Sequence, residues 1–169
     1  VDLTKPIAAN GENGRFVVRE FEHPDHGHSV HHRVELDTSV GTHVLTPRRL
    51  LRWGDALDEI PIETFFGEGL ALRVGGDETV EVGSAELDEV AGSRLQQGDI
   101  VVLAAEGSAE PPARLTKLGA QWLFVRGAKL VVIDERIELG AGGDADGARD
   151  VLTSFFESGM PVVLGVTNT

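Results

Sequence analysis

Residues 38–50 carry the side chains with the greatest capacity for chemistry. This stretch reads TSVGTHVLTPRRL, with His43 in a Gly-Thr-His core and with Arg48 and Arg49 after a proline. Histidine takes up and releases protons near neutral pH, and an arginine guanidinium binds a carboxylate, enolate or oxyanion through paired hydrogen bonds. The pattern therefore predicts His43 as a catalytic acid/base and Arg49, with Arg48 beside it, as an anion-stabilising group.

Polar and aromatic side chains around His43 are candidates for binding a substrate. Ser39 and Thr42 could orient the substrate through their hydroxyl groups, and Arg48 adds a second positive charge. Trp53 follows the arginines, where it either forms a wall of the pocket or packs against the protein. These four residues form the predicted substrate-binding set.

Two pairs of carboxylates could join the same site. Asp134 and Glu135 come at the end of a predicted buried strand, where α/β sheets usually place ligands, so either is a candidate for lining the pocket. Asp58 and Glu59 could act as acid and base. Residues of this kind more commonly cap a turn or pair with a nearby arginine.

Histidines are dense between residues 22 and 32, which read EHPDHGHSVHH. In an extended strand, His26 and His28 would share one side, whereas His31 and His32 would point to opposite faces. Two interpretations remain open for the His23–His32 cluster, a solvated polar loop and a relocated metal site.

The composition limits the classes of function. The chain has 169 residues, a length typical of one domain over residues 1–169, and no cysteine, which excludes disulfides and thiolate ligands. Its net charge of −13 argues against duplex nucleic acid and anionic membranes as partners. We find no secretory apolar region and no apolar run near 18 residues, so a cytoplasmic location is expected.

The elements that must position these residues follow a mixed α/β pattern. Strands are expected over 15–20, 30–37, 69–74, 98–105, 128–134 and 160–168, and helices over 83–92, 113–127 and 146–159. The alternation from residue 98 onward predicts parallel strands with right-handed crossovers. Ser84 is expected to cap its helix. The inward faces of the last two helices are expected to be Leu115, Leu118, Trp122 and Val125, and Val151, Leu152, Phe155 and Phe156.

Several segments taken together resemble the cyclase family, whose members include kynurenine formamidase and isatin hydrolase. These segments are VDLT at the start, GTHV near residue 42, DEIPIE at 58–63, GDIVVL at 98–103, LTKLGAQWLFVRGAKLVVID at 115–134 and SGMPVVLGVTN near the end. The resemblance covers almost the whole chain. It implies a swivelling β/β/α fold with a mixed sheet and flanking helices, a homodimer or larger homo-oligomer, and a small-molecule substrate.

The metal-binding pattern of that family is H-x-G-T-H-x-D-x-P-x-H. Two His and one Asp hold Zn²⁺ or Mn²⁺, the last His is the acid/base, and a His and a Glu near the C-terminus complete the site. In this chain His43 matches, whereas Ser39, Leu45, Arg49 and Leu164 replace His, Asp, His and Glu, and Lys5 replaces a His that often follows the opening DLT. One imidazole does not hold a dication at useful affinity, and Arg49 would repel it. We therefore predict no metal and no cofactor.

Three functions remain open on these residues. The first is a metal-independent cyclase, or a related lyase or isomerase, acting on a small carbonyl-containing molecule, with specialised metabolism as a candidate setting. The second is a non-catalytic descendant that binds a ligand or stabilises a partner, with Leu45 and Leu164 filling the former site. The third is a metal-dependent amide or lactam hydrolase whose ligands have moved to another place.

Overall fold

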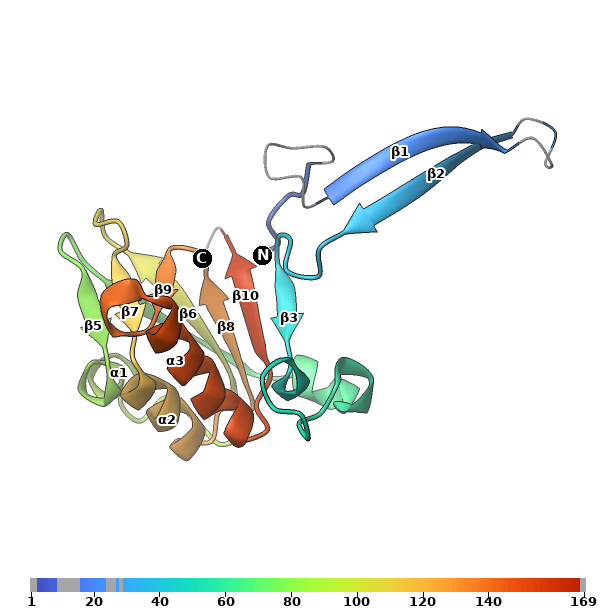
Figure 1. Ribbon diagram of the computed structural model, residues 1–169. Helices are drawn as coiled ribbons and strands as arrows, with labels where there is room; N and C mark the ends of the chain where they lie inside the picture. The colour runs from blue at the N-terminus through green and yellow to red at the C-terminus, as the bar shows by residue number, and fades with distance from the viewer. Residues whose placement is uncertain (1–2, 9–15, 24–26, 28, 168–169) are drawn as a thin grey trace.

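The computed structural model describes residues 3–8, 16–23, 27 and 29–167 (Figure 1). Its main sheet has five strands in the order β3-β10-β8-β6-β4. The bounds are β3 His43–Leu45, β10 Val162–Val166, β8 Leu130–Asp134, β6 Ile100–Glu106 and β4 Gly69–Gly75. Strands β10, β8, β6 and β4 run parallel, and β3 is antiparallel to β10. The predicted parallel pairing after residue 98 is therefore confirmed.

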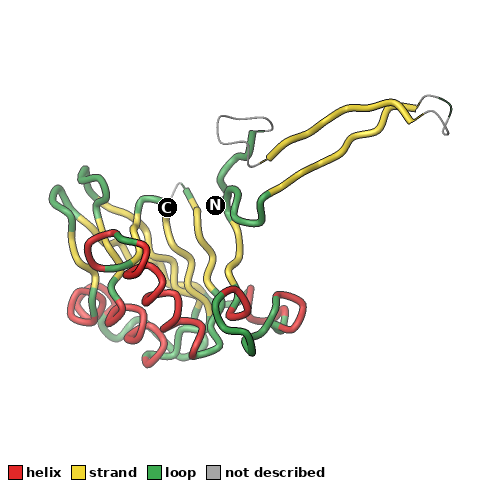
Figure 2. The backbone as a smooth tube through the Cα atoms, in the orientation of Figure 1, coloured by secondary structure: helices red, strands yellow, loops and turns green. Residues whose placement is uncertain are grey.

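A second, smaller sheet and one set of helices complete the body of the molecule. The smaller sheet contains β5 (Val80–Val82), β7 (Ala113–Leu115) and β9 (Ile137–Leu139), all parallel. Helices α1 (Ser84–Ala91), α2 (Lys117–Val125) and α3 (Ala145–Glu157) lie together on one side of the main sheet (Figures 1 and 2). Short 3₁₀ helices are η2 (Pro47–Arg49), η3 (Leu57–Glu59), η4 (Ile62–Phe65) and η5 (Ala141–Gly143). Two sheets with helices on one side confirm the expected β/β/α architecture.

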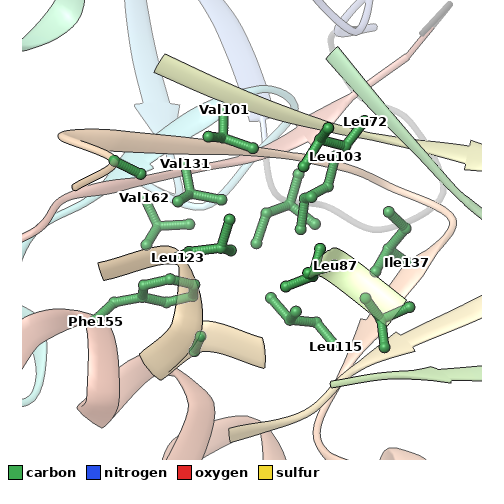
Figure 3. Close-up of a cluster of buried hydrophobic side chains, with 14 of the residues drawn as sticks. Leu72, Leu87, Val101, Leu103, Leu115, Leu123, Val131, Ile137, Phe155 and Val162 are labelled. Carbon is green, nitrogen blue, oxygen red and sulfur yellow. The ribbon is translucent and has the colours of Figure 1, made fainter. Parts of the chain in front are cut away.

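The hydrophobic core lies between the main sheet and the helices. Strands β6 and β8 read as nearly continuous apolar runs, as expected for strands inside a parallel sheet. Their Leu103 and Val131 are fully buried, and Phe155 of α3 packs with them in the same cluster (Figure 3). The expected inward face of α3 is confirmed, because Val151 and Phe156 are buried as well.

The inward face predicted for α2 is wrong in part. Leu118 and Val125 are 64% and 77% exposed, and the buried face of the helix consists of Gly119, Ala120 and Leu123. A Cβ at Gly119 would lie 2.5 Å from the Val82 carbonyl oxygen, so α2 packs closely on its neighbours through its smallest residue. Close backbone approach at Gly119, together with the burial of Leu123, therefore defines the buried face.

The cap of α1 also differs from the prediction. Gly83, rather than Ser84, is the N-cap residue, and its backbone N–H donates to the Glu86 carboxylate at 3.0 Å. An acidic side chain in the first turn is favourable at the positive end of the helix dipole. Glu86 therefore supplies the stabilisation that the sequence assigned to the serine.

A long two-stranded hairpin projects from the body of the molecule (Figures 1 and 2). Strands β1 (Phe16–His23) and β2 (Ser29–Leu36) pair antiparallel over their full length. Nearly all described side chains of β2 are exposed, and they include Val30, Val34 and Leu36. Among the described residues, no helix combines the length and apolar composition needed to cross a membrane.

Candidate functional site

A cavity of about 290 Å³ opens beside His43; we call it the His43 pocket. Its polar lining residues are Lys5, Ser39, His43, Asp134 and Glu135, and its apolar ones are Ile133, Ile137, Leu139 and Leu164. Asp134 ends β8, Leu164 lies in β10, and His43 begins the antiparallel strand β3. The pocket thus lies at the carboxyl edge of the parallel strands, where ligands of α/β folds usually bind.

Strand pairing brings His43 and Leu164 together. The two residues are direct partners in the antiparallel pair of β3 and β10, so their side chains share one face. Immediately afterwards, the pairing of β10 with β8 shifts register between Leu164 and Val166. Gly165 lies in this irregularity with φ +73°, and a Cβ there would lie 2.7 Å from the Gly41 carbonyl oxygen. The close approach of these two backbones requires glycine at position 165.

One ring nitrogen of His43 is held by the backbone. Nδ1 lies 2.8 Å from the Gly41 carbonyl oxygen, and a carbonyl can only accept, so Nδ1 carries the proton of this hydrogen bond. In the neutral ring, Nε2 then holds the free lone pair. His43 is therefore oriented by its own loop and retains one nitrogen that can accept a proton.

Lys5 brings a positive charge into the pocket that the motif analysis did not place there. Its ammonium forms an ion pair and hydrogen bond with Glu135. The N-terminal segment is fixed beside the site because the Lys5 backbone N–H donates to Thr42 Oγ1 (2.8 Å) and the Thr167 N–H donates to the Leu3 carbonyl (3.0 Å). The only sequence signal for this role was that Lys5 stands where the resembling family often has a histidine.

Both carboxylates at the end of β8 line the pocket, as the sequence suggested for either of them. Asp134 is buried, and its carboxylate accepts from the backbone N–H groups of Ala105 (3.1 Å) and Arg136 (2.9 Å). It therefore joins β6 to β8 and shapes the turn that follows. Glu135 pairs with Lys5, and its own N–H donates to Val166 (3.0 Å).

Ser39 and Thr42 have different surroundings from those predicted. Ser39 lines the pocket, but its hydroxyl donates to the Asp37 carboxylate at 2.6 Å. Thr42 is not among the lining residues; its hydroxyl donates to the Gly165 carbonyl at 2.8 Å and accepts from the Lys5 backbone. Thr42 thus holds three segments together, and direct contact with a substrate is not its observed role.

The two arginines and Trp53 do not share the pocket with His43. Arg49 is exposed and ends η2, which follows the far end of β3. Arg48 donates to the Gly54 carbonyl and to Glu59, which also accepts from the Ala56 N–H and so caps η3. Trp53 is 83% exposed beside a different hollow. Within one chain, Arg48, Arg49 and Trp53 are not among the lining residues of the His43 pocket, and their roles beside His43 remain predictions.

The donor set of the His43 pocket does not fit the dication of the resembling family. Among the described residues that line it, His43 is the only imidazole, and Leu164 supplies a hydrocarbon surface beside it. Leu45, at the position of the family's aspartate, is 5% exposed in the core. The described residues contain no group of three or more His, Cys, Asp or Glu side chains arranged to hold a metal. A catalytic dication needs about three protein ligands, which these side chains do not offer.

The described histidines of the hairpin have local partners. His31 Nε2 lies 2.8 Å from Ser29 Oγ, and its ring stacks on Phe21. His32 faces Glu20 at 3.6 Å on the other side of the ribbon, as expected for neighbours on a strand. His26 and His28 lie outside the described residues, as does the side chain of His23.

A larger hollow of about 540 Å³ lies at the end of α2, away from this chemistry. Its two cations are used by the protein itself. Lys129 donates to the carbonyls of Glu63 and Phe66, and Arg126 donates to Gly92 and packs over Trp122. The His43 pocket is therefore the better candidate for a reactive site.

Comparisons with known proteins agree with this architecture. The family model named Cyclase matches residues 1–136. A predicted metal-dependent hydrolase from Bacillus stearothermophilus superposes with a TM-score of 0.68 at 19% identity, over 98% of this chain and 81% of its own. A potential metal-dependent hydrolase with cyclase activity gives 0.69 at 17%, over 98% and 80%.

Isatin hydrolase A from Labrenzia aggregata is also similar in structure. It gives a TM-score of 0.68 at 15% identity, over 99% of this chain and 77% of its own. No curated protein sequence matches the chain. At these identities the structural likenesses establish the fold, and the family model, which spans most of the sequence, establishes the family: the chain belongs to the cyclase family.

Proposed function

We propose that this chain is a metal-independent cyclase, or a related lyase or isomerase, acting on a small carbonyl-containing molecule at the His43 pocket. The observation that carries the proposal is the state of His43. Its Nδ1 is anchored on Gly41, its Nε2 is left with a lone pair in the neutral ring, and it lines a cavity of about 290 Å³. Such a group can move a proton within a bound substrate.

The rate enhancement that such groups can supply limits the kinds of reaction that the pocket could catalyse. A positioned acid/base contributes roughly 10²–10⁴-fold, and an anion-stabilising donor roughly 10²–10³-fold. Together they suit an intrinsically easy ring closure, dehydration or tautomerisation. Hydrolysis of an unactivated amide, for which the family uses its dication, would need a larger rate enhancement. Because Arg49 does not line the His43 pocket, we look for this donor among the residues that do.

One observation favours a second candidate, a non-catalytic protein that binds a small ligand. Leu164 forms an apolar wall where the family has a carboxylate, and Leu45 fills the core. Replacing buried charges by apolar side chains can raise stability at the expense of catalysis. This candidate differs from the first in its prediction for turnover, because it allows binding without reaction.

Deuterium exchange tests the proposal with a panel of candidate carbonyl compounds. A set of 1,3-diketones, cyclic ketones and 2-oxo acids is incubated with the protein in D₂O, and the loss of α-proton signals is followed by NMR. We expect at least one compound to exchange faster with protein than with buffer at the same pH. If compounds bind but none exchanges faster than in buffer, the chain is a ligand-binding protein.

We further propose that the chain forms a homodimer or larger homo-oligomer through the β1–β2 hairpin. An isolated two-stranded ribbon is marginally stable at best. Here one face presents Val30, Val34 and Leu36 to solvent in the single chain. These side chains lie on the same face of β2, with His32 between Val30 and Val34, and they form an apolar stripe that a second copy can cover.

The Val30→Glu/Val34→Glu double variant is expected to reduce the mass of the assembly in solution, because it places two charges in the apolar stripe. Light scattering after size-exclusion chromatography measures this mass. Ser29→Glu/Arg33→Glu, on the opposite face of the same strand, is the matched control and should leave the assembly intact. Equal masses for both double variants and the unmodified chain would remove the hairpin from the interface.

A further inference from the structure

The His43 pocket contains a positive charge for which the proposed reaction has a use. Lys5 Nζ is one of its lining groups and, among the described residues, its hydrogen-bond partner is Glu135. An ammonium has three N–H donors, so two remain for a ligand. Neither arginine of the sequence motif lines this cavity. Among the described residues that line this pocket, Lys5 is therefore the one with a lysine or arginine side chain.

The position of Lys5 is built into the fold. Its backbone N–H is held by Thr42, the residue next to His43, and Thr42 in turn is bonded to Gly165. The segment then passes over Gly41, where a Cβ would lie 2.7 Å from Ile7 Cγ1. These contacts fix the root of the lysine beside the loop that orients the imidazole. Lys5 and His43 are therefore held in one site by the same set of contacts, although they are far apart in the sequence.

We propose that Lys5 is a catalytic residue whose ammonium takes the electrostatic place of the family's dication and binds the carbonyl oxygen of the substrate. This inference rests on the proposed function of His43. Lys5 and Glu135 are partly exposed, at 46% and 35%, and such ion pairs contribute little to stability. The pair can therefore rearrange when a substrate oxygen arrives, whereas a buried pair would resist it.

The proposed step is an enolisation. His43 Nε2 takes a proton from the carbon next to the carbonyl, and the electrons of that C–H bond form the new C=C bond. The electrons of the C=O π bond move to oxygen, where the Lys5 N–H groups stabilise the negative charge. The protonated imidazole then returns its proton to another atom of the same molecule, so that no further reactant is consumed.

The charges of the lining residues define the substrate class. Among the described lining residues, Lys5 is opposed by two carboxylates, Asp134 and Glu135, so these side chains carry no net positive charge. A separate carboxylate on the substrate would be repelled by these acids. Four apolar side chains, Ile133, Ile137, Leu139 and Leu164, also line the pocket. The inferred substrate is a neutral carbonyl compound with an apolar body, and neutral diketones should exchange faster than 2-oxo acids.

Binding of 4-nitrophenol tests the role of Lys5 without turnover. The phenolate resembles an enolate in charge and absorbs at a longer wavelength than the phenol. A cation within hydrogen-bonding distance should raise the acid dissociation constant of the bound probe roughly 10- to 1000-fold. Lys5→Met should abolish this rise, and Lys5→Arg, which keeps the charge, should retain part of it.

Lys117→Met is the matched control, because Lys117 is exposed on α2 and does not line the pocket. It should behave like the unmodified chain. If the probe does not bind, binds only as the neutral phenol, or ionises equally in Lys5→Met, the inference is wrong. The bound 4-nitrophenol should still ionise in the His43→Ala variant. If ionisation of the probe depends on Lys5 but no compound shows deuterium exchange, Lys5 binds the anionic oxygen and the proposed reaction is wrong.

Discussion

His43→Ala is expected to lower protein-catalysed deuterium exchange by roughly 10²–10⁴-fold, the usual contribution of a positioned acid/base. The substitution removes the nitrogen that accepts the proton and leaves the pocket otherwise lined as before. His43 is half-buried, and its ring is hydrogen-bonded to its own loop at Gly41, so the fold should persist. The measurement is the NMR exchange rate per enzyme at saturating concentration of the most reactive compound.

His31→Ala is the matched control for this prediction. His31 lies on the hairpin strand β2, away from the residues that line the His43 pocket, and it should leave the exchange rate unchanged. Circular dichroism of both variants shows whether they fold. A folded His43→Ala protein that keeps the full exchange rate would remove His43 from the chemistry and favour the ligand-binding alternative.

Ser39→His/Leu164→Glu is expected to create a metal site where the unmodified pocket has none. Leu164 is the cross-strand partner of His43, so a carboxylate introduced there would share a face with the imidazole. Ser39 lines the same pocket. Together with His43 Nε2, the two new side chains supply three ligands, the set that a Zn²⁺ site with an open position uses. We expect about one Zn²⁺ per chain by elemental analysis.

The control for this variant is Ser39→His/Leu164→Gln, which keeps the size of the new side chain and removes its charge. It should bind Zn²⁺ more weakly, because the carboxylate is both a ligand and a counter-charge. Adding His43→Ala to the Ser39→His/Leu164→Glu protein should abolish binding. A folded double variant that takes up no zinc would mean that something other than the missing ligands prevents metal binding.

The sequence predicted the framework well where local pattern and packing agree. Buried parallel strands such as β6 and β8 are continuous apolar runs between turns, and such runs can be recognised in a single sequence. The amphipathic helix α3 was predicted for the same reason. The α2 face was misjudged because its packing depends on Gly119, and periodicity counts large apolar residues rather than close backbone contacts.

The site was predicted only in part, since closeness in sequence is a poor guide to closeness in space. Arg49 follows His43 shortly in the chain, but His43 begins strand β3 and Arg49 ends η2 after it, and an extended strand moves successive residues apart quickly. Lys5 and Glu135 are distant from His43 in sequence and are joined to it by sheet pairing and by the Thr42 bridge. The sequence named Glu135 as a candidate from its place at the end of a strand, whereas the place of Lys5 beside His43 follows from contacts that only the fold reveals.

The metal content of the unmodified protein tests the central claim most directly. The protein is incubated with excess Zn²⁺ or Mn²⁺, freed of unbound ions by gel filtration and analysed by mass spectrometry, alongside His43→Ala. The account predicts the same low metal content in both proteins, together with deuterium exchange that persists after treatment with a chelator. About one metal ion per chain that is lost in His43→Ala, with activity that follows the metal, would contradict it.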